Sequence, residues 1–218
     1  MINLTKLWTG VAQPADGLRY GHGRGAAASA RKRRPIVVWN ITRTCNLRCV
    51  HCYSDSEAAN YPGELVWDQI EAVVEDLAEY QVPSLLLSGG EPMVHPHFFK
   101  LVDLASSKGL KLTISTNGTL ITPEKAAMLK AANVAYVGIS LDGIGEVHDR
   151  FRRMEGAFAA AVNGFRACHE ANQKTGLRLT LTRHNVENIE QILDFIEAEE
   201  IKRVCFYHLV PAGRGSEL

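Results

Sequence analysis

The chain has 218 residues, 46% of them hydrophobic and 22% charged, a composition typical of one globular domain with a full hydrophobic core. Basic and acidic residues number 24 each, so the net charge is zero and no overall field favours nucleic acid or an anionic membrane as partner. No apolar run approaches the roughly 20 residues of a membrane span, and five cysteines, three of them clustered, indicate a reducing cytoplasm rather than a disulfide framework.

The first 34 residues hold most of the local charge imbalance. This segment contains the basic run at residues 31–34 and three further basic residues, but only one acidic residue, Asp16. We expect residues 1–34 to form a solvated basic arm and residues 35–218 to form the core domain. No aromatic residue interrupts the basic run, so a role in binding nucleic acid is not indicated.

From residue 35 onward, short apolar runs alternate with amphipathic helical patterns. Helical spacing recurs near residues 70–77, 98–105 and 189–196, and Thr122 followed by Pro123 is typical of a helix N-terminus. The predicted strands cover residues 36–41, 84–87, 111–115, 135–140, 177–181 and 203–208. Because strands that alternate with helices pair in parallel, the pattern predicts an α/β fold, either a doubly wound sheet or part of a (β/α) barrel.

Three cysteines lie close together after the first predicted strand. Cys45, Cys49 and Cys52 are followed directly by Tyr53. Three thiolates leave one iron of a four-iron cluster with an open coordination site, where a small molecule can bind and react. The same spacing also suits a structural zinc site, which a fourth Cys or His normally closes. Both interpretations stay open on the spacing alone.

Unusual loops also follow the next three predicted strands. They contribute Gly89, Gly90, Glu91, Thr116, Asn117, Ser140 and Asp142. The carboxyl ends of parallel strands meet at one edge, so these loops converge there with the cysteines. The paired glycines let backbone grip a ligand amino group, Glu91 adds a charged anchor, and Ser140 and Asp142 suit a ribose. With Arg152 for a ligand carboxylate, we predict a pocket for a nucleoside that carries an amino-acid group.

The four motifs together resemble those of the radical S-adenosylmethionine (SAM) enzymes: CxxxCxxC with an aromatic neighbour, GGEP, TNG and SLDG. The resemblance implies a partial six-stranded (β/α)6 parallel barrel. It also implies a [4Fe-4S] cluster on Cys45, Cys49 and Cys52, with SAM on the open iron and Tyr53 beside it. An electron from a donor such as flavodoxin or ferredoxin would cleave SAM to methionine and a 5'-deoxyadenosyl radical, which takes hydrogen from the substrate.

Segments outside these motifs resemble the haem-biosynthesis branch of the family. They are residues 1–8, 18–21, 37–40 and 205–215. The branch implies a tetrapyrrole substrate and the removal of acetate side chains from didecarboxysiroheme to give iron-coproporphyrin. Candidate partners for the substrate carboxylates are Arg150, Arg152, Arg153, Arg178 and Arg214. The alternatives are haem d1 maturation, iron-coproporphyrin decarboxylation, a peptide-modifying maturase, and a non-catalytic metal-binding fragment.

Members of this branch usually continue into a cysteine-rich extension that holds a further iron-sulfur cluster. The present chain ends at Leu218, soon after the Ala-Gly-Arg-Gly segment. We therefore expect the site for SAM cleavage to be intact and the overall reaction to be impaired.

Overall fold

The computed structural model describes residues 34–218, and these residues alternate between strands and helices. The predicted basic arm lies outside the described residues except for Arg34, and stays a prediction. The strands are β1 (Val37–Asn40), β2 (Leu85–Ser88), β3 (Leu112–Thr116), β4 (Tyr136–Ser140), β5 (Thr175–Leu181) and β6 (Val204–His208). The α-helices are α4 (Trp67–Glu79), α5 (Phe98–Ser107), α6 (Pro123–Ala131), α7 (Glu146–Arg152), α8 (Ala157–Glu170) and α9 (Ile189–Ala198). Three 3-10 turns are η1 (Pro92–Val94), η2 (Val186–Asn188) and η3 (Gly213–Glu217).

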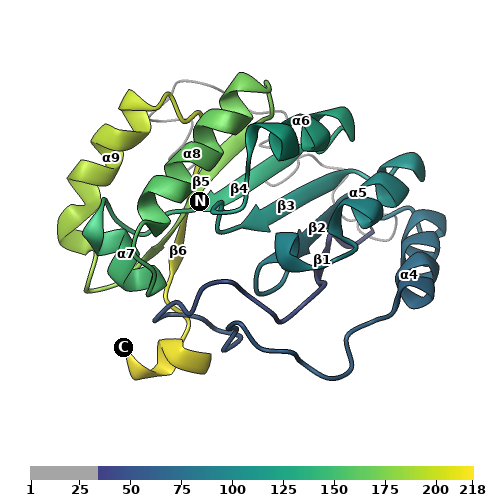
Figure 1. Ribbon diagram of the computed structural model, residues 1–218, viewed down its shortest axis with the longest axis horizontal. Coiled ribbons are helices and arrows are strands. Elements are labelled where there is room, and N and C mark those ends of the chain that lie inside the picture. The colour runs from purple at the N-terminus through teal and green to yellow at the C-terminus, as the bar shows by residue number, and fades with distance from the viewer. Residues whose placement is uncertain (1–33) are drawn as a thin grey trace, which may run out of the picture.

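The six strands form one parallel sheet in the order β1-β2-β3-β4-β5-β6. A doubly wound sheet reverses its strand order at a switch point, whereas every crossover here continues in the same direction. The helices consequently form an arc around one side of the curved sheet (Figure 1). The fold is the partial (β/α)6 barrel, and the doubly wound alternative is wrong.

Burial alternates along the strands, because successive side chains point to opposite faces of a sheet. The helix-covered face holds the core residues Leu85, Leu87, Leu112, Ile114, Val137, Ile139, Leu177 and Leu179. Each such side chain contributes about 1.5–3 kcal/mol when it leaves water. The intervening side chains, among them Ser115 and Arg178, face the concave side and stay partly exposed. The concave side is thus left open for a ligand.

The four helices predicted by residue range are confirmed, and α7 and α8 are further helices for which no range was predicted. Thr122 Oγ1 accepts from the Lys125 N–H at 3.2 Å, as expected of a helix cap. Helix α8 packs largely through small side chains. A Cβ at Gly164 would lie 2.6 Å from the Gly118 carbonyl oxygen, so this helix approaches the loop after β3 backbone to backbone. Within the described chain, no helix is both long and apolar enough to cross a membrane.

Candidate cluster and SAM site

The three cysteines of the loop after β1 gather in a small cluster of their own. Cys45 and Cys49 are buried with Leu47, and Cys52 packs against them. The Leu47 N–H donates to Cys45 Sγ at 3.4 Å, and Arg152 Nη1 donates to Cys49 Sγ at 3.4 Å. N–H donors aimed at sulfur favour the thiolate, which is the form that ligates a metal.

Burial and hydrogen bonding set the thiol pKa values of the loop differently. Burial raises the pKa of Cys45 to about 12, against a smaller opposite effect of the Leu47 N–H. Burial also acts to raise the pKa of Cys52, but hydrogen bonds from the Ser54 hydroxyl and the Ser56 N–H outweigh it, and the pKa is lowered. A bound metal centre would supply the positive charge that Cys45 needs to lose its proton.

The packing of the three cysteines is compatible with an iron-sulfur cluster. In a four-iron cluster each thiolate ligates a different iron, so the sulfurs must be near one another without meeting at a point. Cys45, Cys49 and Cys52 pack together in one loop. That they hold the cluster stays a prediction.

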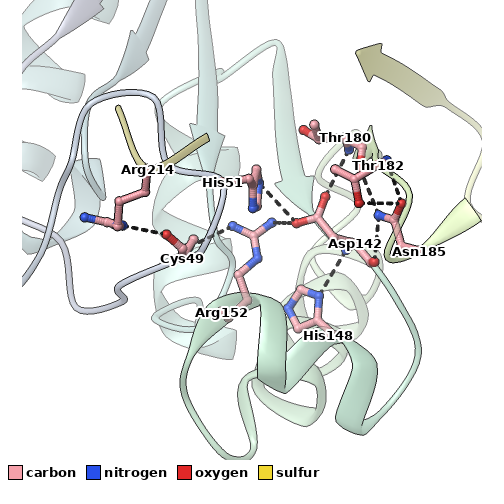
Figure 2. A network of polar contacts seen from close by, with 9 residues as sticks. All are labelled: Cys49, His51, Asp142, His148, Arg152, Thr180, Thr182, Asn185 and Arg214. Atoms are coloured by element: carbon pink, nitrogen blue, oxygen red, sulfur yellow. Dashed lines mark hydrogen bonds and ion pairs between the residues drawn. The ribbon is translucent and has the colours of Figure 1, made fainter. Parts of the chain in front are cut away.

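The C-terminal turn η3 contacts the cysteine loop through Arg214 and Gly213. Arg214 Nε donates to the Cys49 carbonyl at 2.8 Å, Nη2 donates to the Ser56 carbonyl at 2.8 Å, and its backbone N–H donates to the Cys52 carbonyl at 3.0 Å. A Cβ at Gly213 would lie 2.5 Å from that same Cys52 oxygen. Figure 1 shows η3 beside the loop that follows β1, and Figure 2 shows Arg214 reaching Cys49. Arg214, expected among the substrate arginines, is occupied in shaping this loop.

The backbone of residues 42–44 packs so closely against Gly89 and Gly90, the pair after β2, that neither position has room for a side chain. The Gly90 N–H donates to the Thr42 carbonyl at 2.8 Å, and the Glu91 N–H donates to the Thr44 carbonyl at 3.0 Å. A Cβ would lie 2.3 Å from the Thr42 oxygen at Gly89 and 2.4 Å from the Thr44 oxygen at Gly90. Only glycine permits this approach, which joins the end of β2 to the residues that lead into the cluster loop.

Glu91 joins the loops after β2 and β3 with a fully buried carboxylate. It accepts from Thr116 Oγ1 at 2.8 Å, from the Asn117 N–H at 2.7 Å and from the Met93 N–H at 3.1 Å. Burial raises the Glu91 pKa, and these hydrogen bonds act against that rise. Asn117 Nδ2 then donates to Asn46 Oδ1 at 2.9 Å, beside the first cysteine. In this structure Glu91 positions its neighbours, and its direct contact with SAM stays a prediction.

Asp142, after β4, is the centre of a buried charged network (Figure 2). Its carboxylate pairs with the Arg152 guanidinium, lies 3.5 Å from His51 Nε2, and accepts from the Thr180 N–H at 2.9 Å. Burial acts to raise the Asp142 pKa, but Arg152 and His51 outweigh it, and the pKa is lowered. Because Arg152 also contacts Cys49 Sγ, one guanidinium spans the carboxylate and a predicted cluster ligand.

Two buried residues that the motifs did not indicate hold this loop in place. His148 Nδ1 accepts from the Asp142 N–H at 3.0 Å. Asn185 Nδ2 donates to the Asp142 carbonyl at 3.0 Å and to the Thr180 carbonyl at 2.9 Å (Figure 2). Both side chains are almost fully buried. Their only signal in the sequence is polarity within otherwise apolar surroundings, which does not reveal a partner.

The remaining predicted residues lie at the outer part of the same edge. Ser140 ends β4, is partly exposed, and is the register partner of Arg178 on β5. Tyr53 is 55% exposed, and its hydroxyl lies 3.5 Å from Asn40 Oδ1. The predicted residues thus come from neighbouring loops at the carboxyl edge, and their individual contacts with SAM stay predictions.

We expect the metal-free chain to lose stability in mild acid through His148. Burial, with repulsion from Arg152 next, lowers the His148 pKa from 6.5 to about 3 in the fold. The group is then neutral when folded and takes up a proton when unfolded, so stability falls as the pH drops below 6.5 towards 3. Between about pH 7 and pH 5.5 this one group should cost about 1 kcal/mol of unfolding free energy.

Urea unfolding of the wild type and of His148→Gln at both pH values measures that cost. Glutamine keeps an acceptor for the Asp142 N–H but does not titrate, so the variant should show the smaller loss between the two pH values. An equal loss in both proteins would show that His148 is not held neutral by the fold.

Comparison with known proteins supports the geometry of the site. The family model described as the Radical SAM superfamily matches residues 39–196. The chain belongs to the radical SAM superfamily. The predicted cofactors, a [4Fe-4S] cluster and SAM, are those of this family.

Several of the curated relatives come from the haem branch. The chain is 46% identical over 223 residues to an "Fe-coproporphyrin III synthase" of Methanosarcina barkeri, covering 100% of this chain and 56% of that protein. It is 41% identical over 184 residues to a "Pre-heme d1 synthase" of Dinoroseobacter shibae, covering 84% and 46%. It is 36% identical over 185 residues to an "AdoMet-dependent heme synthase" of Methanosarcina barkeri, covering 84% and 52%. The chain spans about half the length of these relatives, and the resemblance to the haem-biosynthesis branch is confirmed.

Solved structures share the fold at lower sequence identity. The chain aligns with "Native anSMEcpe with bound AdoMet" at a TM-score of 0.70 and 21% identity, covering 80% of this chain and 51% of that one. It aligns with Streptococcus suis SuiB bound to S-adenosylmethionine at a TM-score of 0.70 and 17% identity, covering 92% and 47%. The partial barrel is thus a radical SAM fold.

Proposed function

We propose that the chain is the radical SAM core of an enzyme that cleaves SAM reductively and removes acetate side chains from didecarboxysiroheme to give iron-coproporphyrin. The observation that carries the proposal is the 46% identity, over the whole chain, to a protein named for the synthesis of Fe-coproporphyrin III. The relatives named for heme and heme d1 synthesis support the same substrate class.

When bound, the cluster supplies the electron that splits the sulfonium of SAM. The chain's own contribution is to hold the three thiols in one loop, which Arg214 and the Gly89–Gly90 approach keep in place. We expect Arg152, which lies beside Cys49 Sγ and pairs with Asp142, to bind the carboxylate of SAM as well. We expect Ser140, at the end of β4, to bind its ribose.

We further propose a reducing cytoplasmic location and a flavodoxin or ferredoxin as electron donor. The cysteine usage supports the location, since three of the five cysteines are committed to one loop. The chain spans about half of its curated relatives, so we propose SAM cleavage for residues 1–218 and turnover of the tetrapyrrole for the enzyme as a whole.

Formation of haem d1 is the second candidate function. It is favoured by the 41% identity to the Pre-heme d1 synthase. A peptide substrate has weaker support, since the Mycofactocin maturase MftC of Mycobacterium ulcerans is 36% identical over 184 residues.

Anaerobic reconstitution with iron and sulfide, followed by reduction with dithionite and addition of SAM, tests the proposal. We expect a brown protein with absorption near ~400 nm, release of 5'-deoxyadenosine, and loss of acetate from added didecarboxysiroheme by mass spectrometry. Release of 5'-deoxyadenosine without any change in the tetrapyrrole would support SAM cleavage and reject didecarboxysiroheme as the substrate. No release from folded protein with a filled cluster would overturn the proposed activity itself.

A further inference from the structure

Arg178 faces the open interior of the half-barrel. It lies on β5 between Leu177 and Leu179, which are both buried on the helix-covered side. Its own side chain therefore points to the concave side, where it stays partly exposed. Its register partners are Ser140 at the end of β4 and Cys205 on β6. The position is level with the part of the edge where we expect SAM.

The Arg178 side chain is held in one orientation by its neighbours. A Cβ at Gly138 would lie 2.6 Å from Arg178 Cδ, so the aliphatic part of the arginine crosses β4 where glycine leaves room. Its guanidinium carbon lies 5.0 Å from the centroid of the Tyr207 ring on β6. The Arg178 guanidinium also hydrogen-bonds to the Tyr207 side chain. A guanidinium carries five N–H donors, so others are left for a planar acceptor such as a carboxylate.

The charge of Arg178 is not matched by an acid of the described chain. The ion pairs within residues 34–218 involve other cationic residues, namely Arg48, His51, Lys108, Arg152, Arg166 and Arg214. Of the five arginines that the sequence offers for substrate carboxylates, Arg214 binds carbonyls of the cysteine loop. Arg152 pairs with Asp142 and is the arginine that we propose for the carboxylate of SAM. Arg150 and Arg153 are exposed at α7. Arg178 is the one that lies inside the half-barrel.

We propose that Arg178, backed by Tyr207, binds a carboxylate side chain of the tetrapyrrole inside the half-barrel. The inference rests on the proposed function, because it takes the substrate to be a macrocycle with several carboxylates. A guanidinium that keeps N–H donors beyond its contact with Tyr207, in a concave and partly exposed site, gives a charge-assisted contact with such a group. Its closeness in register to Ser140 keeps the anchored substrate beside the predicted SAM site.

Binding of coproporphyrin III to the reconstituted protein, compared with binding of the same porphyrin after conversion of its carboxylates to primary amides, tests the proposal. The wild type should bind the carboxylate form at least about tenfold more tightly than the amide form, and Arg178→Met should lose most of that preference. Arg178→Lys keeps the positive charge and should retain part of it. A purely structural role of Arg178 would weaken both porphyrins alike and leave their ratio unchanged.

Arg203 provides the matched control. It precedes β6 on the same face, and its guanidinium carbon lies 5.0 Å from the Tyr136 ring centroid. It is also absent from the ion pairs of the described residues, but it lies two residues farther from the carboxyl edge than Cys205. Arg203→Met should therefore keep the preference of the wild type for the carboxylate porphyrin.

The outcomes separate this inference from the proposed function. A wild type that binds neither porphyrin overturns both. A wild type that prefers the carboxylate form, together with an Arg178→Met variant that keeps the full preference, overturns only the role of Arg178. If Arg178→Met and Arg203→Met lose the preference for the carboxylate porphyrin equally, the assignment of the carboxylate contact to Arg178 is overturned.

Discussion

Replacing any one of Cys45, Cys49 and Cys52 with alanine should abolish SAM cleavage and leave the reconstituted protein without its full iron content. Loss of an outer-shell partner of a metal ligand typically costs 10–100-fold, so removal of a ligand itself should lower 5'-deoxyadenosine formation by more than about 100-fold. Iron and sulfide analysis, absorption spectra and chromatography of 5'-deoxyadenosine measure the effect. A variant that keeps both full iron content and activity would remove that cysteine from the site.

Cys168 is the matched control for these substitutions. It is fully buried on α8, where burial raises its thiol pKa to about 12. A buried thiol without a nearby cation is inert and behaves as a small hydrophobic side chain. Cys168→Ala should therefore bind iron and cleave SAM as the wild type does. A comparable loss of iron in this control would mean that the losses in the other variants reflect general instability.

Replacing Asp142 with alanine should lower the free energy of unfolding of the metal-free chain by about 3–5 kcal/mol, the usual cost of removing one partner of a buried ion pair. The reason is that Arg152, only 7% exposed at its side chain, would keep its charge without a carboxylate. The Thr180 N–H would lose its acceptor as well. Urea unfolding followed by circular dichroism measures the change.

A surface ion pair of the same chain provides the comparison. Arg166 and Glu199 lie 2.6 Å apart with side chains 60% and 19% exposed, so Glu199→Ala should cost only about 0–1 kcal/mol. The double variant Asp142→Ala/Arg152→Met removes both buried charges and should recover part of the loss. If Asp142→Ala proved as mild as Glu199→Ala, the network in Figure 2 would not hold the loop after β4.

The strands and the four motif loops could be predicted because each is recognised from a few consecutive residues. All six predicted strands overlap the observed ones, and the four motifs lie after successive strands at one edge. Alternation of short apolar runs with helices leaves parallel pairing as the consistent arrangement. No residue range was predicted for α8, because the alanine and glycine through which it approaches Gly118 are a weaker apolar signal than the larger side chains of the other helices.

The uses of individual polar side chains were harder to predict, because a motif shows which residue is present and not which partner it meets. Glu91 was expected to anchor a ligand, which stays a prediction, and its carboxylate also accepts three hydrogen bonds from the protein that no motif indicates. Arg214 was grouped with the substrate arginines, yet its guanidinium binds carbonyls of a loop that precedes it by more than 150 residues. Both roles depend on where distant parts of the chain meet.

By itself, the sequence determined the family and the parallel α/β arrangement and predicted the cluster ligands, because donor spacing and strand alternation are properties of a few consecutive residues. Only the tertiary structure decided between a doubly wound sheet and a half-barrel, and showed that Arg152 and Arg214 serve the cysteine loop while Arg178 faces the interior. The physical reason is that a charge finds its partner through the path of the whole chain, which brings together residues that no local spacing connects.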